Sequence, residues 1–311
     1  MATPLLHRTF AVTVAWTLGL LLLGSVVHAT ESSLACPDWP TCFGTMMPEM
    51  VGGVFWEHLH RLVAGGLILL FGAATWLAWR ARARPWIVKA SAAGVVLLLV
   101  QAVFGGLTVL WRLPDAVSTT HLGLAFLFLG LATVLAAATS PRREERPRLG
   151  AGPRRLLTIG GATASGLVFV QSLLGAYVRH ADAGMACGRG VLCNGGLVPP
   201  AFNHLIGIHY LHRVVGVVTA LVVLGLAVAL VRRTSADFVR RMAWTTAALV
   251  AAQVALGFLG AYTALAVVPV SLHTLGAAGL LSATVLLATW GRLDRSPRED
   301  PRAAAAAARA A

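Results

Sequence analysis

Eight stretches of about 20 mostly apolar residues dominate this 311-residue sequence. A helix that crosses a bilayer needs roughly 20 such residues. Charged residues make up 12% of the chain and hydrophobic residues 57%, about half the charge that covers a water-soluble domain. This composition excludes a soluble globular protein and a disordered chain, so the sequence predicts an all-α membrane protein. The predicted spans are 10–29, 57–79, 86–111, 117–139, 156–178, 204–231, 242–264 and 270–291.

The first apolar stretch follows Arg8 and resembles the apolar region of a signal peptide. Its apolar core runs from Phe10 to Val27, which is longer than that region usually is. We therefore expect a retained membrane helix at the N-terminus, and eight spans in all.

The formal net charge is +13, from 25 basic and 12 acidic residues. Twenty of the basic residues lie at the termini or in the connections on one side of the predicted spans. The opposite side carries three, Arg112, Arg179 and Arg189. Basic residues collect in cytoplasmic loops, so we expect a multi-pass protein of the cell membrane with both termini cytoplasmic. The orientation of the chain in the membrane then explains the net positive charge, and no nucleic-acid partner is implied.

The chain contains an internal duplication. Gln101 follows His60 by 41 residues, and His121 follows Gln101 by 20. The same residue types recur 152 positions later with the same spacing, as His212, Gln253 and His273. A repeat of this kind predicts two tandem four-helix bundles, related by a pseudo-twofold axis along the membrane normal.

The duplication sets the expected domain boundaries. Residues 1–139 form the N-terminal half and residues 156–291 the C-terminal half, joined by an Arg-rich cytoplasmic linker over 140–155. The tail over 292–311 is rich in Arg, Asp, Pro and Ala, and we expect it to be disordered.

Intramembrane histidines are costly and are usually functional. Four of them occupy matched positions near the outer ends of their spans: His60, His121, His212 and His273. Zinc, which needs a tetrahedron of ligands, fits two histidines per half poorly, whereas haem iron takes one or two axial imidazoles. The sequence therefore predicts a haem-iron ligand pair in each half. His7, His28 and His180 have no counterpart in the repeat and are taken as incidental.

Other residues beside these histidines have two interpretations each. Arg61 and Arg213 follow His60 and His212 directly, and each could bind a haem propionate or reach the membrane interface. A set of glycines could make room for porphyrin or serve ordinary helix packing: Gly65, Gly66, Gly105, Gly106, Gly216, Gly257 and Gly260.

Glu57 breaks the symmetry between the halves, because its counterpart is His209. It lies one turn from His60 on the same helix face and could act as an acid or base at a haem edge. The alternative is an interfacial carboxylate that caps its helix. His58 points to another face of the helix than His60, and the roles of His58 and His204 stay open.

Two cysteine pairs, Cys36/Cys42 and Cys187/Cys193, share the same spacing and fall in the predicted outer loops. An oxidising compartment favours a disulfide in each loop. Each pair could fasten its loop, or could exchange electrons with an external thiol partner. We favour the fastening role for the second pair and leave both open for the first.

The combined pattern resembles the haem A synthase family in its bacterial form, from the first helix to about Gly291. The resemblance rests on Glu57-x-x-His60-Arg61, His121, His212-Arg213, His273 and the two cysteine pairs. It implies an oxidoreductase that converts the C8 methyl of haem O to a formyl group by successive hydroxylations.

The same resemblance assigns roles to individual residues. It implies that His60 and His121 bind haem O, that His212 and His273 bind a haem b cofactor, and that Glu57 is catalytic. It also implies a structural Cys187–Cys193 disulfide and a Cys36–Cys42 pair with possible redox activity. Haem O synthase and an electron acceptor or thiol-redox partner are the candidate partners.

Two other functions compete with this one. A bis-histidine dihaem protein could only pass electrons, but transmembrane transfer would place haems on both sides of the bilayer. A disulfide-generating oxidoreductase would need a close C-x-x-C and a quinone site, and it would leave the four histidines unexplained.

Overall fold

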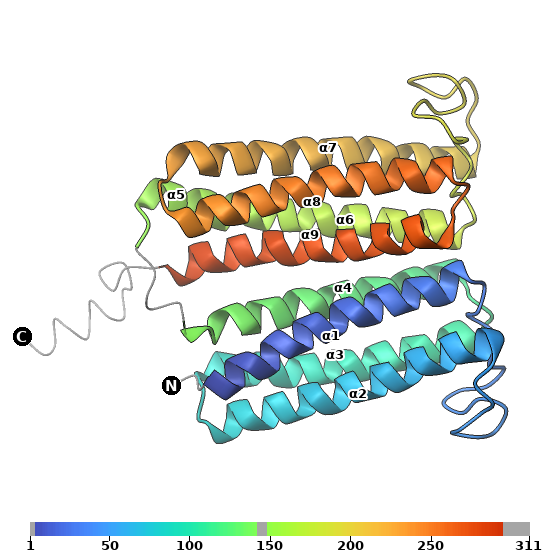
Figure 1. Ribbon diagram of the computed structural model, residues 1–311, viewed down its shortest axis with the longest axis horizontal. Helices are drawn as coiled ribbons and strands as arrows, with labels where there is room; N and C mark the ends of the chain where they lie inside the picture. The colour runs from blue at the N-terminus through green and yellow to red at the C-terminus, as the bar shows by residue number, and fades with distance from the viewer. Residues whose placement is uncertain (1–3, 142–147, 295–311) are drawn as a thin grey trace, which may run out of the picture.

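The computed structural model describes residues 4–141 and 148–294 of the chain (Figure 1). The described residues form helices joined by turns and loops, without a β-strand. The four long helices of the first half are α1 (Pro4–Ala29), α2 (Gly52–Arg80), α3 (Pro85–Leu110) and α4 (Asp115–Ala138). The second half contains α5 (Ala151–Arg155), a π-helical turn (Leu156–Gly160), α6 (Gly161–His180), α7 (His204–Arg233), α8 (Asp237–Tyr262) and α9 (Val267–Leu293).

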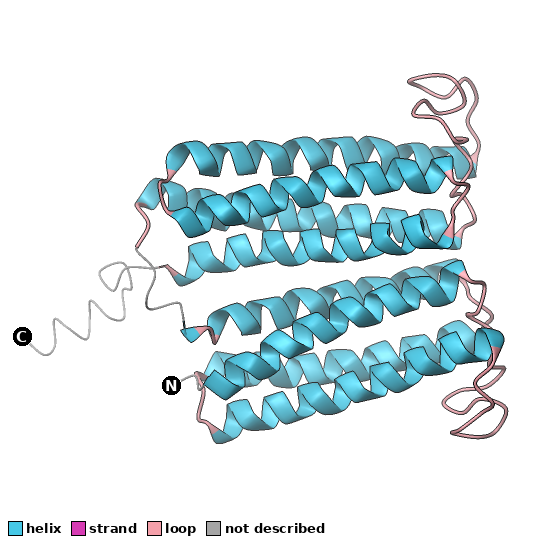
Figure 2. Ribbon diagram, in the orientation of Figure 1, coloured by secondary structure: helices cyan, strands magenta, loops and turns pink. Residues whose placement is uncertain are grey.

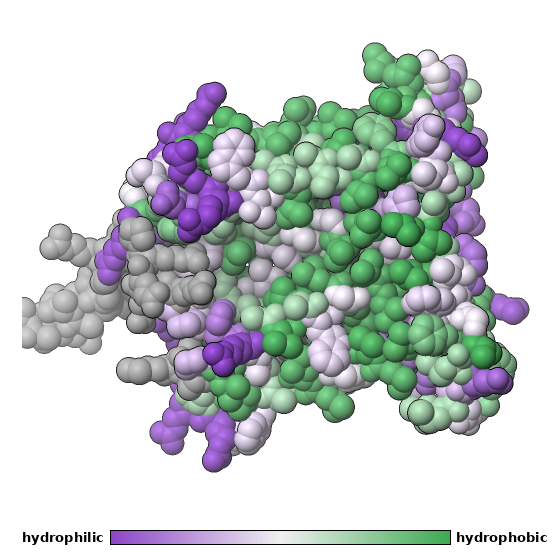
Figure 3. All heavy atoms as spheres, viewed as in Figure 1, coloured by the Kyte–Doolittle hydropathy of each residue, from purple (hydrophilic) through white to green (hydrophobic). Residues whose placement is uncertain are grey.

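All eight predicted spans are confirmed as helices long and apolar enough to cross a membrane. The fifth span begins at Ala151 instead of residue 156, because α5, the π-helical turn and α6 run on as one helix to His180. Residues 151–155, which were predicted as the end of the 140–155 linker, therefore belong to the fifth helical span. In Figure 3, hydrophobic side chains cover the middle of the bundle and hydrophilic ones gather toward its ends, as expected of a multi-pass membrane protein.

Local sequence signals explain where the helices begin and end. Pro85 opens α3 at a position where its missing N–H costs nothing. The Asn203 side chain accepts a hydrogen bond from the Ile206 amide (2.8 Å) and so caps α7. Arg82 and Asp182, which follow α2 and α6, adopt a left-handed backbone conformation that stops each helix.

Helices α1–α4 lie together in one half of the molecule and α6–α9 in the other (Figure 1). Within the first half α1 packs on α2, α2 on α3, α3 on α4 and α1 on α4. The second half repeats this set with α6 on α7, α7 on α8, α8 on α9 and α6 on α9. Between the halves, α1 contacts α9 and α4 contacts α6 and α9. This pattern is the one that a twofold relation would produce, although the axis and the domain boundaries themselves stay predictions.

Two long loops project from one end of the bundle, before α2 and before α7 (Figure 2). These are the loops that carry the cysteine pairs. Residues 142–147 of the predicted linker and residues 295–311 of the predicted tail lie outside the part of the chain that the structure describes.

Aromatic packing ties α1, α2 and α4 together in the core of the first half. Phe71 of α2 is fully buried; its ring centroid lies 6.0 Å from that of Phe10 and 4.9 Å from that of Phe128. Aromatic rings in tilted or edge-to-face contact at these distances attract each other beyond the area that they bury.

We expect Phe71→Ala to lower the free energy of unfolding by about 3 kcal/mol, because it opens a cavity between three helices. The matched control on the same helix is Leu69→Ala, whose side chain is 76% exposed and should change stability by less than about 0.5 kcal/mol. Thermal unfolding in detergent measures both variants. Equal midpoints for the two would contradict this account of the core.

Candidate haem-binding site

The structure places the four matched histidines at similar depths. His60 and His212 lie in the third turn of α2 and α7, and His121 and His273 in the second turn of α4 and α9. With a rise of about 1.5 Å per residue, each lies roughly 9–12 Å from the loop end of its helix. His60 is close enough to His121, and His212 to His273, for their charges to interact. Each half therefore brings two imidazoles together from two helices.

His121 and His273 share one hydrogen-bond arrangement. Nδ1 of His121 lies 3.1 Å from the backbone carbonyl of Gln101, and Nδ1 of His273 lies 3.1 Å from that of Gln253. In both cases the side-chain amide of the same glutamine lies 3.3 Å from Nε2. The arrangement recurs in both halves because the duplication preserves the glutamine and its distance from the histidine.

This arrangement suits an axial ligand of haem iron. Only a protonated Nδ1 can donate to a carbonyl, so the bond assigns the proton of His121 and of His273 to Nδ1. Nε2 then carries the lone pair that a metal requires, and in this structure that lone pair faces the glutamine amide, which would have to give way to a metal. Metal-binding histidines commonly donate their other ring N–H to a backbone carbonyl, which fixes the tautomer and the ring orientation. His121 and His273 therefore each fit an axial ligand of haem iron, one in each half.

The other two histidines differ between the halves. The Gln171 amide nitrogen lies 3.0 Å from Nδ1 of His212 and donates to the His212 carbonyl at 2.9 Å. His60 has a buried Nδ1 without a hydrogen-bond partner in the described chain. The residue 151 positions before Gln171 is Leu20, which cannot replace the amide. Sequence reasoning missed Gln171. The repeat could have indicated it, because a polar residue in one half has an apolar counterpart in the other.

Glu57 is buried, with 4% of its surface exposed, and points to the cysteine loop. Its Oε2 accepts a hydrogen bond from the Cys36 amide (2.8 Å), and its Oε1 pairs with the Arg61 guanidinium (2.5 Å). It does not lie in the first turn of α2, so the helix-capping alternative fails. The carboxylate lies one turn from His60 and links α2 to the loop.

Arg61, which follows His60, contacts both Glu57 and the first cysteine loop. Besides its ion pair with Glu57, its Nη1 donates to the carbonyls of Asp38 (2.8 Å) and Thr41 (2.6 Å). Both carbonyls belong to the loop between Cys36 and Cys42. The guanidinium therefore holds this loop against α2.

The second half repeats this arrangement with different chemistry. His209 replaces Glu57; its Nδ1 lies 3.4 Å from the Cys187 amide and 2.8 Å from the Ala183 carbonyl. Arg213 donates through Nε to Nε2 of His209 (3.2 Å). Its other nitrogens donate to loop carbonyls of Gly188, Gly190 and Val191. The imidazole thus also links its helix to the loop, but it does so by accepting from Arg213 and donating to the Ala183 carbonyl.

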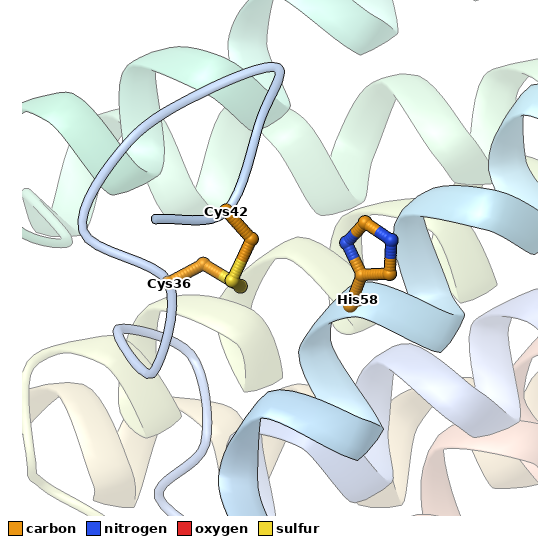
Figure 4. Close-up of side chains that lie close together, drawn as sticks. All are labelled: Cys36, Cys42 and His58. Atoms are coloured by element: carbon orange, nitrogen blue, oxygen red, sulfur yellow. A yellow bond between two sulfur atoms is a disulfide. The ribbon is translucent and has the colours of Figure 1, made fainter. Parts of the chain in front are cut away.

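Both cysteine pairs form disulfides, and all four cysteines are buried. The sulfur atoms of Cys36 and Cys42 lie within 4.8 Å of a ring nitrogen of His58, which faces them in Figure 4. Because the disulfide engages both sulfurs, the cluster offers no thiolate to a metal. Burial also separates the sulfurs from an external thiol, so the structure favours the fastening role for both pairs.

Hydrogen bonds within the first loop hold its shape. The Asp38 carboxylate accepts hydrogen bonds from the Thr41 hydroxyl and from the amides of Gly44 (2.9 Å) and Phe43 (2.7 Å). These bonds favour the charged form, so they lower the pKa of Asp38 below its usual value. The loop that covers Glu57 is therefore stabilised by Arg61 on one side and by Asp38 on the other.

The histidines taken as incidental have structural partners. His7 bonds the Ala136 carbonyl (3.0 Å). His28 and His180 stack at the contact between the halves, with ring centroids 4.8 Å apart, and Arg179 donates to the His28 carbonyl. His204 opens α7 and lies near the Tyr177 hydroxyl. Sequence reasoning missed the stacked pair because it joins helices from different halves.

Comparison with known proteins gives a consistent result. The COX15-CtaA family, described as a cytochrome oxidase assembly protein, matches residues 50–285. A haem A synthase of Symbiobacterium thermophilum is 37% identical over 250 residues, which cover 77% of this chain and 80% of the relative. A haem A synthase of Shouchella clausii is 30% identical over 70% of this chain and 74% of its own length. One from Halalkalibacterium halodurans is 29% identical over 73% and 76%.

The matched region contains both histidine pairs, Glu57 and the second cysteine loop. It covers more than half of the chain and includes α2–α4 and α6–α8 completely. The chain therefore belongs to the COX15-CtaA family of cytochrome oxidase assembly proteins.

Proposed function

We propose that this chain is a haem A synthase, a membrane oxidoreductase that acts on a CH group. It oxidises the C8 methyl of haem O to a formyl group by successive hydroxylations and so yields haem A for terminal oxidases. The relatives that cover most of the chain carry this name. The observation that carries the proposal is the duplicated ligand arrangement, in which His121 and His273 each donate from Nδ1 and keep Nε2 for iron.

The two halves hold haem for different purposes. His212 and His273, with Arg213, form the site of a resident haem b, whereas His60 and His121, with Arg61, form the site of the haem O substrate. The Gln171 contact distinguishes the two halves because it holds the His212 ring in place in this structure. Its amide donates to Nδ1, so it has to turn away, or Nε2 has to lose its proton, before Nε2 of His212 can bind iron. His60 lacks such a partner within the described residues, so its ring is freer to reorient when substrate enters and product leaves.

Glu57 provides the acid–base group of the substrate half. When bound, the haem iron and porphyrin supply the redox chemistry, and the protein has to position the methyl edge and manage protons. Glu57 suits the second task because it is a buried carboxylate one turn from His60. Arg61 and the Cys36 amide hold it in place. In the second half, His209 occupies the position equivalent to Glu57, so no carboxylate lies there.

Haem O enters sideways from the lipid, because its farnesyl chain is too apolar for water. The histidine sites lie near the loop ends of membrane helices, within reach of one leaflet. The distribution of basic residues supports a multi-pass location in the cell membrane with both termini cytoplasmic. Haem O synthase, as the source of substrate, and an electron acceptor or thiol-redox partner are the proposed partners.

Haem extraction with mass analysis tests the function directly. The protein is expressed in cells with and without a haem O synthase, and its bound haems are identified. We expect haem b alone without the synthase, and haem A or its hydroxylated precursor with it. Haem b alone in both cases, with haem O present in the membrane, would contradict the proposal and favour an electron-transfer cytochrome.

We expect Glu57→Gln to retain bound haem and to lower product formation by about 100-fold or more, because the amide accepts the Cys36 hydrogen bond but cannot exchange a proton. Glu49→Gln, in the exposed part of the same loop, should have no effect. Product formation and haem content are measured on the same membranes. Wild-type turnover by Glu57→Gln would refute the acid–base role.

The duplication provides a second comparison. Arg61→Leu leaves the buried Glu57 carboxylate without its ion pair, which should cost about 3 kcal/mol of stability. Arg213→Leu leaves His209, a group that can stay neutral, and should cost roughly 1 kcal/mol. Thermal unfolding of both variants measures the difference. A larger loss for Arg213→Leu would mean that the Glu57–Arg61 pair does not anchor the loop as described.

A further inference from the structure

Each of the four matched histidines presents the Cε1 edge of its ring to a glycine of a neighbouring helix. A Cβ atom built on Gly24 would lie 3.0 Å from Cε1 of His60, and one built on Gly105 would lie 3.0 Å from Cε1 of His121. In the second half the distances are 2.8 Å from Gly175 to His212 and 3.0 Å from Gly257 to His273. At every ligand position, therefore, a methyl group in place of the glycine hydrogen would press on the imidazole.

The glycines follow the duplication as closely as the histidines do. Gly24 and Gly105 lie on α1 and α3, and Gly175 and Gly257 on α6 and α8. The offset is 151 between Gly24 and Gly175 and 152 between Gly105 and Gly257. Helices α1, α3, α6 and α8 thus each supply one glycine to a histidine of a neighbouring helix.

Ordinary helix packing does not explain these four positions. Gly66 of α2 faces the ring of Trp16 on α1, which is the small-residue packing expected between membrane helices. Gly106 of α3 faces the ring of Trp39, which belongs to the first cysteine loop. At the four matched positions the neighbour is the ligand side chain itself. A metal ligand tolerates little displacement, because its lone pair must point at the iron.

We propose that Gly24, Gly105, Gly175 and Gly257 are positioning residues of the two haem sites: the missing side chain leaves the space in which each ligand imidazole takes its ring orientation. This inference rests on the proposed haem function and adds residues that do not touch iron. Carbonyls of Gln101 and Gln253 hold Nδ1 of His121 and His273, and the glycines leave room at the adjacent Cε1.

The chain offers matched controls on the same helices. Gly166 of α6 and Gly19 of α1 have nothing within 4 Å of an added Cβ in the described structure. Gly175→Ala is therefore compared with Gly166→Ala, and Gly24→Ala with Gly19→Ala. In a helix, alanine is otherwise the more favourable residue, so the controls should fold at least as well as the wild type.

The first experiment uses the full chain expressed without haem O synthase, so that haem b alone is available. Haem-to-protein ratio, optical spectrum and the low-spin ferric electron paramagnetic resonance signal are recorded for wild type, Gly175→Ala and Gly166→Ala. We expect Gly175→Ala to weaken haem binding roughly 10-fold or more and to shift the low-spin signal of the haem that remains. Gly166→Ala should match the wild type in both readouts.

Gly257→Ala affects His273, the second proposed ligand of the same haem. Because Gly257 lies on α8 and Gly175 on α6, the two variants together distinguish an effect on the ligands from a folding defect of one helix. Unchanged haem content and signal in both Gly175→Ala and Gly257→Ala would overturn the inference. Equal loss of haem in Gly166→Ala, or unfolding of both ligand-facing variants, would assign these glycines to helix packing and would also overturn it. A wild type without haem would instead contradict the proposed function.

Discussion

The cost of a polar group inside the bilayer governs this structure. An imidazole, a carboxylate or a backbone N–H without a partner is expensive where no water can reach it. The eight spans satisfy their backbones as helices, and several of the buried polar side chains near the histidines bond to one another or to a backbone group in small sets. His121 and His273 use glutamine carbonyls, Glu57 uses Arg61 and a loop amide, and His209 uses Arg213. Each set joins a span to a neighbouring helix or loop, so the same bonds that satisfy these groups also position them.

Duplication turns this constraint into a division of labour. The ligand histidines, their glutamines and the glycines beside them are the same in both halves, so both halves keep the framework of a haem site. The differences concentrate beside the first histidine of each pair. Gln171 restrains His212 in one half, whereas Leu20 occupies the equivalent place in the other, and Glu57 is exchanged for His209. These differences are the basis of our proposal that one copy holds a cofactor permanently and that the other binds and releases a substrate beside a buried carboxylate.

Much of the fold, and the matched placement of four histidines, follows from the sequence, because hydrophobic length and the repeat register are local or periodic signals. The eight spans and the four matched histidines could be read in this way. The role of Arg61 could not, because it depends on how the Cys36–Cys42 loop folds back onto α2. The His28–His180 stack and the glycine contacts also escaped the sequence, since both depend on which helices become neighbours in space. Residues far apart in the chain meet only through tertiary packing, which no spacing rule records.

The central claim is that the second half alone holds the resident haem. It is tested most directly by the haem content of His273→Ala and His121→Ala, each purified from cells without haem O synthase. The account predicts that His273→Ala loses its bis-imidazole haem b, whereas His121→Ala keeps about the wild-type amount. Loss of haem b from His121→Ala with retention in His273→Ala would contradict the account and would exchange the roles of the two halves.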